Sequence, residues 1–136
     1  MSTGSRVRIV VAIVALVFGA LTIVSGGRAL FGDEAARAAV GAAVPFVLWF
    51  NFGAGFAYVA AGFGLLMRSR WSAWLSALIA TATVLVFLAF GIHVASGGAY
   101  EMRTVIAMAF RSLVWIAIAF FAWRMADLGA RDRTST

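Results

Sequence analysis

Cysteine and lysine are absent from this chain of 136 residues, and proline and histidine occur once each. Without cysteine the chain forms no disulfide, no thiolate metal site and no thiol nucleophile. Without lysine it forms no Schiff base. Acidic residues are scarce: five Asp and Glu stand against eleven arginines, which gives a formal charge of +6. In a soluble domain a charge this positive suggests binding to nucleic acid. Here, however, the arginines border apolar runs of the sequence. Anionic lipid headgroups are therefore the simpler partner, and we expect no nucleic acid.

Hydrophobic residues, by contrast, make up 64% of the chain, and the mean hydropathy is +1.01. About 20 apolar residues are needed to cross the hydrocarbon of a bilayer. The sequence therefore predicts an all-α integral membrane protein, an antiparallel (up-and-down) bundle of four transmembrane helices that forms a single domain over residues 1–136. The expected helices are residues 7–28, 44–67, 71–96 and 101–125, with a short basic tail at 126–136. The first run exceeds the core of a signal peptide, so we expect it to be retained.

The distribution of arginines predicts an orientation. Most arginines fall on the side of the membrane that holds both termini, and those on the other side are accompanied by Asp33, Glu34 and Glu101. Because cytoplasmic loops are enriched in positive charge, both termini are expected in the cytoplasm. The use of arginine at every basic position suggests a GC-rich bacterial genome and hence a bacterial cytoplasmic (inner) membrane. The arginines on the side of the termini are Arg6, Arg8, Arg68, Arg70, Arg124, Arg131 and Arg133.

The connections carry their own signals. An alanine-rich stretch at 28–44 is consistent with a short surface helix, and Pro45 suits the first turn of the second span. The sequence Ser-Gly-Gly occurs at 25–27 and again at 96–98, where glycine is expected to end the first and third spans as a left-handed cap. Two such caps explain the repeat more simply than a duplicated hairpin does.

Arg111 is the most informative residue, because it lies within an otherwise apolar span at 104–123. A charged residue at membrane depth needs a partner and faces a bundle interior or a wet cavity. Helical spacing places Arg111 on one stripe of its helix, and Asn51 on the second span is its expected partner. Arg111, Asn51 and His93 are expected in the half of the bundle away from the termini. The candidate polar network comprises Arg111, Asn51, His93, Glu101, Thr104, Ser112 and Tyr58.

Two interpretations of this network stay open, and the first is the one that the sequence favours. In the first, the network is satisfied internally and fixes how the helices meet. The chain is then a non-enzymatic accessory or scaffold protein that associates with itself or with a larger membrane complex through small-residue faces. In the second, Arg111 anchors an anionic or polar solute in an outer-half pocket, and the chain is a small carrier or binding protein. The packing glycines of the first interpretation are Gly53, Gly55, Gly62 and Gly64.

Cofactor and catalytic signals are weak. His93, Glu101 and Met102 are metal-ligand types without tight spacing, and one histidine supplies only one axial ligand to a haem. We therefore predict no metal, no cofactor and no enzymatic activity. Glu101 and Arg103 are expected to form an exposed ion pair at the rim of the membrane.

A pattern of glycines and arginines runs through the first half of the chain. A first helix from Arg8 to Leu30 ends in Ser-Gly-Gly-Arg-Ala-Leu-Phe-Gly, and a glycine-rich span at 52–67 leads into Arg68-Ser-Arg-Trp-Ser-Ala-Trp. This pattern, over the first two or three helices, resembles the small four-helix membrane proteins of the DoxX-like group. The resemblance implies an up-and-down bundle that works beside a redox or membrane partner. Such proteins often carry an acidic residue where this chain has Trp49-Phe50-Asn51, and no functional residue is carried over.

Overall fold

The computed structural model describes residues 2–135, and all regular structure in that range is helical. Four of the helices are long and apolar enough to cross a membrane, which indicates a multi-pass membrane protein and confirms the predicted all-α class. The remaining helix, α2, is short and confirms the expected surface helix in the first connection. The helices are α1 (Thr3–Phe31), α2 (Glu34–Val40), α3 (Pro45–Leu66), α4 (Trp71–Ala95) and α5 (Met102–Thr134).

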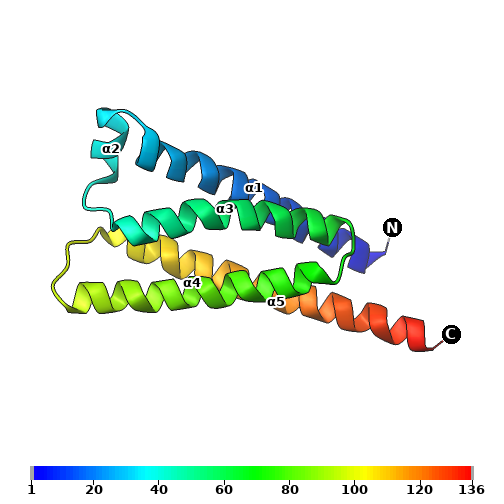
Figure 1. Cartoon of the computed structure of the whole chain (residues 1–136). Helices are drawn as coiled ribbons and strands as arrows, with labels where there is room; N and C mark the ends of the chain where they lie inside the picture. Colours follow the sequence, from blue (N-terminus) through cyan, green and yellow to red (C-terminus); the bar gives the residue numbers. More distant parts are fainter. Residues whose placement is uncertain (1, 136) are drawn as a thin grey trace.

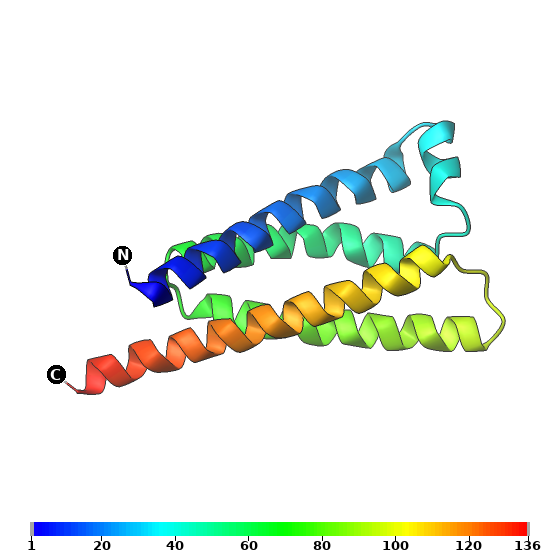
Figure 2. The same cartoon turned by 180° about the vertical axis from the view of Figure 1, so that it is seen from behind.

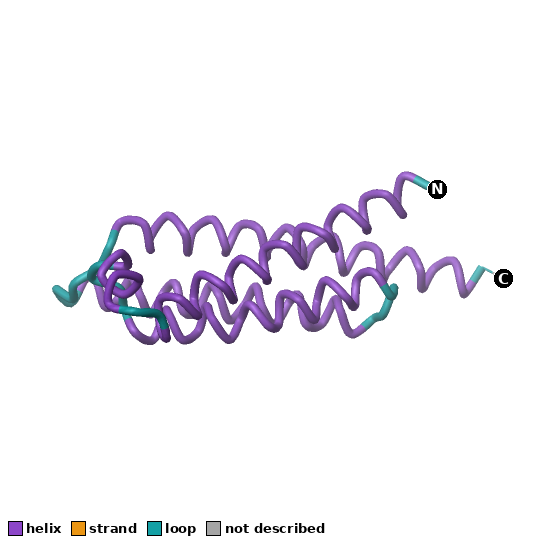
Figure 3. The backbone as a smooth tube through the Cα atoms, turned by 90° about the horizontal axis from the view of Figure 1, so that it is seen from above, coloured by secondary structure: helices purple, strands orange, loops and turns teal. Residues whose placement is uncertain are grey.

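The long helices run back and forth along one direction (Figure 1). Both chain termini lie at the same end of the bundle, here called the termini end, as the reverse view also shows (Figure 2). The helix α2 and the turn after α4 lie at the opposite end, here called the α2 end (Figure 3). Charged residues at the two ends are therefore far apart along the bundle.

The closest helix pair is α1 with α3, and α5 packs mainly against α4. Every buried residue of α1 is small, and they recur at intervals of three and four residues, so they form one face. At Gly19 a Cβ atom would lie 2.9 Å from the carbonyl oxygen of Gly55. Glycine at this crossing lets the two backbones approach closely. The buried face of α1 consists of Ala12, Ala15, Gly19, Thr22 and Gly26.

Aromatic side chains link the two helix pairs in the middle of the bundle. Tyr58 of α3 stacks on Phe18 of α1, with ring centroids 5.5 Å apart, and lies 4.6 Å from the ring of Trp115 of α5. Tyr58 and Trp115 are completely buried. The aromatic cluster Phe18, Tyr58 and Trp115 thus forms a packed layer between the α2 end and the termini end. Met108 lies three residues before Arg111 on the same stripe of α5 and is also buried, which confirms that this stripe faces the bundle interior.

Some predicted helix ends are wrong. Helix α1 continues through the first Ser-Gly-Gly to Phe31, because Gly26 is buried against Phe52 and serves helix packing rather than capping. Only the second Ser-Gly-Gly ends a helix, with Gly97 in the left-handed region at φ 85°. Helix α5 extends to Thr134, so most of the expected tail at 126–136 is helical; Thr136 lies outside the described residues. Pro45 begins α3 as predicted.

Candidate functional site

A cavity of about 370 Å³ lies at the α2 end, between α1, α2, α3 and α5. Small-molecule pockets typically measure about 300 to 1,000 Å³ and combine apolar walls with a few polar groups. This cavity, here called the α2-end pocket, has that composition. Its polar lining residues are Ser25, Asn51, Glu101, Arg103, Thr104 and Arg111, and its apolar walls include Ala29, Val44, Val47, Leu48 and Ala107.

Arg111 reaches the pocket from α5 and binds α1. Its Nη1 atom donates to the hydroxyl of Thr22 at 3.0 Å, and its guanidinium carbon lies 5.1 Å from the centre of the Phe18 ring. The Nε atom is buried and has no hydrogen-bond partner in the protein. Since a guanidinium carries five N–H donors, one hydroxyl and one ring leave part of its hydrogen-bonding capacity for a group in the pocket.

Asn51 is the second polar residue of the pocket with unused hydrogen-bonding capacity. It lines the same pocket from α3, and its Oδ1 atom is buried without a hydrogen-bond partner in the protein. The predicted pairing of Asn51 with Arg111 is wrong, because Arg111 binds Thr22 instead. A buried amide oxygen without a donor costs about 1 to 3 kcal/mol, so this position favours a ligand that supplies a donor.

Glu101 and Arg103 bind the backbone around α2. Glu101 accepts a hydrogen bond at 2.9 Å from the N–H of Ala42, and Arg103 donates at 2.9 Å to the carbonyl of Ala39. Gly41 adjoins the Glu101 carboxylate at φ 67°, where a Cβ would both strain the backbone and collide with the carboxylate. The expected ion pair between Glu101 and Arg103 is thus replaced by contacts that fasten α2 over the pocket.

The remaining candidate residues divide between the pocket and other places. Thr104 lines the pocket. Ser112 donates to the carbonyl of Met108 in its own helix at 2.8 Å, and Tyr58 belongs to the aromatic cluster, with its hydroxyl buried and unpartnered. His93 lies 3.0 Å from the carbonyl of Ala99, in the turn after α4. These last three are not lining residues of the pocket, and His93 and Glu101 are held by different backbone groups.

Thr22 is the hydrogen-bond partner of Arg111, and the sequence did not predict it. The signal was present in the small residues of α1, whose spacing places Thr22 on the same face as Gly19 and Gly26. A hydroxyl on a face of alanine and glycine can meet a long side chain from another helix, because small neighbours leave room for it.

The packing glycines contact this chain rather than a neighbour. A Cβ on Gly55 or Gly62 would collide with Ile23 or Leu16 of α1, at 2.8 and 2.7 Å, and one on Gly64 would collide with Trp71. Only Gly53 faces outward, because a Cβ on this residue would meet no atom within 4 Å. Three of the four glycines therefore set the distances between helices of one bundle and are not available to a second protein.

The pocket has the chemistry of an anion-binding site with an apolar wall. Arg103 and Arg111 contribute two positive charges and Glu101 one negative charge, so its formal charge is +1. The unpartnered groups are a cationic donor on Arg111 and a neutral acceptor on Asn51. No protein-family model, curated protein or solved structure matches the chain.

Proposed function

We propose that this chain is a solute-binding membrane protein, of the kind a small carrier requires, and that its ligand is a small amphipathic carboxylate bearing a hydroxyl group. The observation that carries the proposal is the shared position of Arg111 and Asn51. Each has a buried polar atom without a partner in the protein, and both line one pocket. Buried polar groups are nearly always hydrogen-bonded, so a ligand toward which both side chains turn these atoms gains from each.

The two groups define complementary parts of the ligand. A carboxylate suits Arg111, because guanidinium and carboxylate form strong charge-assisted hydrogen bonds. A hydroxyl donor suits the Oδ1 atom of Asn51. An aliphatic remainder suits Val47 and Leu48, which line the same pocket from α3. A dicarboxylate fits less well, because Glu101 adds negative charge at the rim.

The proposed membrane topology supports this assignment. The excess of arginines at the termini end favours both termini in the cytoplasm of a bacterium, and this orientation turns the α2-end pocket toward the outer face of the membrane. An anion arriving from outside then meets Arg103 near the rim and Arg111 deeper in the pocket.

The accessory or scaffold role has less support from the geometry. Gly55, Gly62 and Gly64 are used within the bundle, and Gly53 alone of the four is exposed. Association with a redox or membrane partner, which the resemblance to DoxX-like proteins implies, stays a prediction. So does the absence of enzymatic activity.

The test compares three probes that differ by one group each: α-hydroxyisocaproate, isocaproate and isocaproamide. The purified protein is placed in nanodiscs of neutral phosphatidylcholine, and probe affinity is taken from the shift in thermal unfolding with concentration. We expect affinity to fall in that order, by about tenfold at each step, since one hydrogen bond or one charge is lost each time.

Two variants assign each step to a residue. Asn51→Leu should abolish the difference between the hydroxy acid and isocaproate, and Arg111→Gln should abolish the difference between isocaproate and its amide. Ser112→Ala is the matched control, because its hydroxyl bonds within its own helix. Equal binding of the acid and the amide, or no binding of any probe, would contradict the proposal.

A further inference from the structure

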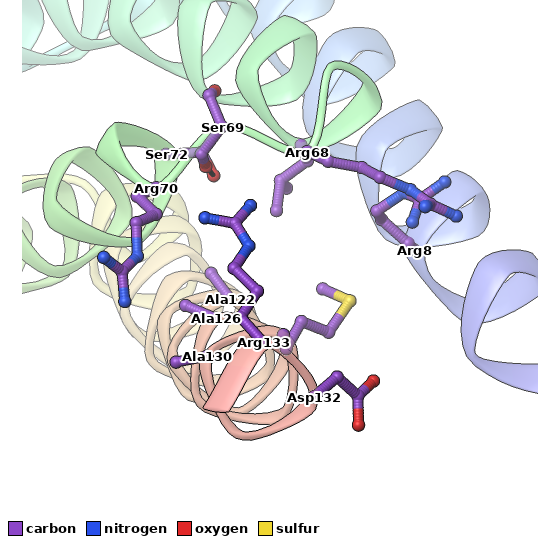
Figure 4. A pocket seen from close by; sticks show the side chains of 13 residues that line it. Arg8, Arg68, Ser69, Arg70, Ser72, Ala122, Ala126, Ala130, Asp132 and Arg133 are labelled. Carbon is purple, nitrogen blue, oxygen red and sulfur yellow. Dashed lines mark hydrogen bonds between the residues drawn. The ribbon is translucent and has the colours of Figure 1, made fainter. Parts of the chain in front are cut away.

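A second cavity, of about 380 Å³, lies at the termini end, remote from the α2-end pocket. It is partly open and is bordered by the start of α1, the turn between α3 and α4, and the last turns of α5 (Figure 4). Its charged lining residues are Arg8, Arg68, Arg70, Arg133 and Asp132. We call it the arginine pocket; four arginines less one aspartate give it a formal charge of +3.

The side chains of Arg8, Arg68 and Arg133 lie on one side of Arg70, whose guanidinium group points away from them (Figure 4). Arg133 extends from α5 toward the turn that holds Arg68, whereas Asp132 is directed away from the arginines (Figure 4). Arg8 and Arg68 are close enough to repel each other electrostatically. Arginine stays protonated in proteins, so the chain cannot relieve this repulsion by losing a proton, and an anion between the groups would relieve it.

Arg8 and Arg68 also have hydrogen-bonding capacity to spare. The Nε atom of Arg8 is buried without a partner in the protein, and Arg68 donates to the hydroxyl of Ser5 at 3.3 Å. That bond is at the long end of the range for hydrogen bonds. A stronger acceptor in the pocket would therefore compete well for both side chains.

The backbone at Arg68 holds its side chain in place at some energetic cost. Helix α3 ends in a Schellman motif, in which the N–H groups of Arg68 and Ser69 bond to the carbonyls of Leu65 and Gly64 at 3.3 and 3.0 Å. The motif puts Arg68 at φ 57°, where glycine is usual, and it is the one non-glycine residue of the described chain with positive φ. Such strain points to a use for the side chain.

The start of α4 adds positive potential to the same pocket. Ser69, Arg70 and Ser72 line the pocket where this helix of 25 residues begins. The N-terminus of a helix carries about half a positive charge and favours anions. The helix end reinforces the arginines, which come from three separate elements of the fold.

From this arrangement we infer that the arginine pocket binds a phosphate group, carried either by a phospholipid headgroup or by a soluble organophosphate. Guanidinium groups from several directions suit a tetrahedral group with several oxygens, and arginine binds phosphate in bidentate fashion. The pocket lies at one end of the helices that are long enough to span a membrane, the end of the bundle at which headgroups would lie. This inference is independent of the ligand proposed for the α2-end pocket.

The experiment has one arm for each source of the phosphate. In the lipid arm, the protein is released for native mass spectrometry from phosphatidylcholine nanodiscs containing a minority of phosphatidic acid, and the retained lipid is identified. In the soluble arm, detergent-purified protein is titrated with glycerol phosphate, and the thermal shift is measured. Retention of phosphatidic acid alone assigns the site to lipid, and a shift with glycerol phosphate assigns it to a soluble ligand.

Arg8→Gln and Arg68→Gln should each weaken phosphate binding about tenfold, since each removes a charge-assisted hydrogen bond. The matched control is Arg124→Gln, an exposed arginine of α5 that is not a lining residue of the pocket; it should change binding less than about twofold. Arg68→Gly separates a loss of binding from a loss of folding. Glycine suits the backbone at this position, so this variant should lower phosphate binding without lowering the melting temperature. An equal loss in Arg124→Gln, or no binding in either arm, would overturn the inference.

Discussion

At the α2 end two exposed arginines bind the protein's own backbone, whereas at the termini end four arginines line a cavity. Arg37 donates to the carbonyl of Leu30 at 3.2 Å, and Arg103 to that of Ala39 at 2.9 Å. These bonds fasten α2 across the bundle. Arg8 and Arg68, by contrast, repel each other, and the Nε atom of Arg8 has no partner.

The same residue type thus has two roles. At the α2 end arginine holds α2 against the bundle, and at the termini end it creates a positive electrostatic potential. The α2-end pocket has a formal charge of +1 from Arg103, Arg111 and Glu101, with a neutral amide beside them, so selectivity there depends on hydrogen-bond geometry. The arginine pocket has +3 and depends mainly on charge. Four experiments test the contrast between the two ends.

The greatest loss is expected from Gly19→Leu, which should destroy both pockets at once. A Cβ there would lie 2.9 Å from the carbonyl of Gly55 and 3.0 Å from Tyr58, where α1 packs against α3. Overpacking of this kind destabilises by about 3 kcal/mol. The free energy of unfolding in mixed micelles measures it, and both ligands should lose binding.

The matched control for this variant is Gly53→Leu. Gly53 lies on α3 near Gly55, but a Cβ there meets no atom within 4 Å. Leucine also favours the helix more than glycine does, so stability should hold or rise. If Gly53→Leu were as damaging as Gly19→Leu, lateral contacts with a second copy would matter more than the α1 and α3 crossing.

The second prediction is that a substitution at the α2 end affects ligand binding at that end alone. Arg111→Gln should weaken carboxylate binding at the α2 end by about 10 to 100 fold, the equivalent of one charge-assisted interaction. Glutamine can still donate to Thr22, so the fold should persist. Retention of phosphatidic acid at the arginine pocket, measured in nanodiscs that contain this lipid, should be unchanged. A parallel loss at both ends would mean that Arg111 holds the bundle together rather than binding a ligand.

The sequence predicts the features of the bundle that depend on apolar length and helical period. The four long helices and the inward stripe of Arg111 follow from those two properties, as the buried Met108 and Trp115 confirm. The Thr22 partner does not follow, because it depends on how α1 is rotated against its neighbours. The predicted cap at Gly26 is wrong for a similar reason, since only the packed structure shows that Phe52 occupies the space beside this glycine.

The third effect is a gain of stability at the termini end. Arg68→Gly should raise the free energy of unfolding by about 1 kcal/mol, because glycine adopts the left-handed conformation without the steric cost that other residues pay. The control is Arg70→Gly, two residues further on. Arg70 has φ −67° in the helical region, so glycine there should lower stability. Thermal unfolding of the two variants side by side gives the sign, and a loss in both would place the strain elsewhere.

The weakest effect is the response to salt, which compares the two pockets within one unmutated protein. Raising the ionic strength from about 0.01 M to about 0.15 M shortens the Debye length from about 30 Å to about 8 Å. Arg68, Arg70 and Arg133 are exposed, whereas Arg111 is partly buried. Phosphate binding should therefore weaken about fivefold, and carboxylate binding less than about twofold, because buried charges are screened less.

Sodium chloride should be used for this comparison, with sucrose of equal osmolality as the control, because sulfate would compete for the arginine pocket directly. If carboxylate binding proved the more salt-sensitive of the two, water and ions would reach Arg111 freely. The Thr22 bond and the cover provided by α2 would then be insufficient to shield the site. Ligand binding at the α2-end pocket would depend on charge more than ligand binding at the arginine pocket does.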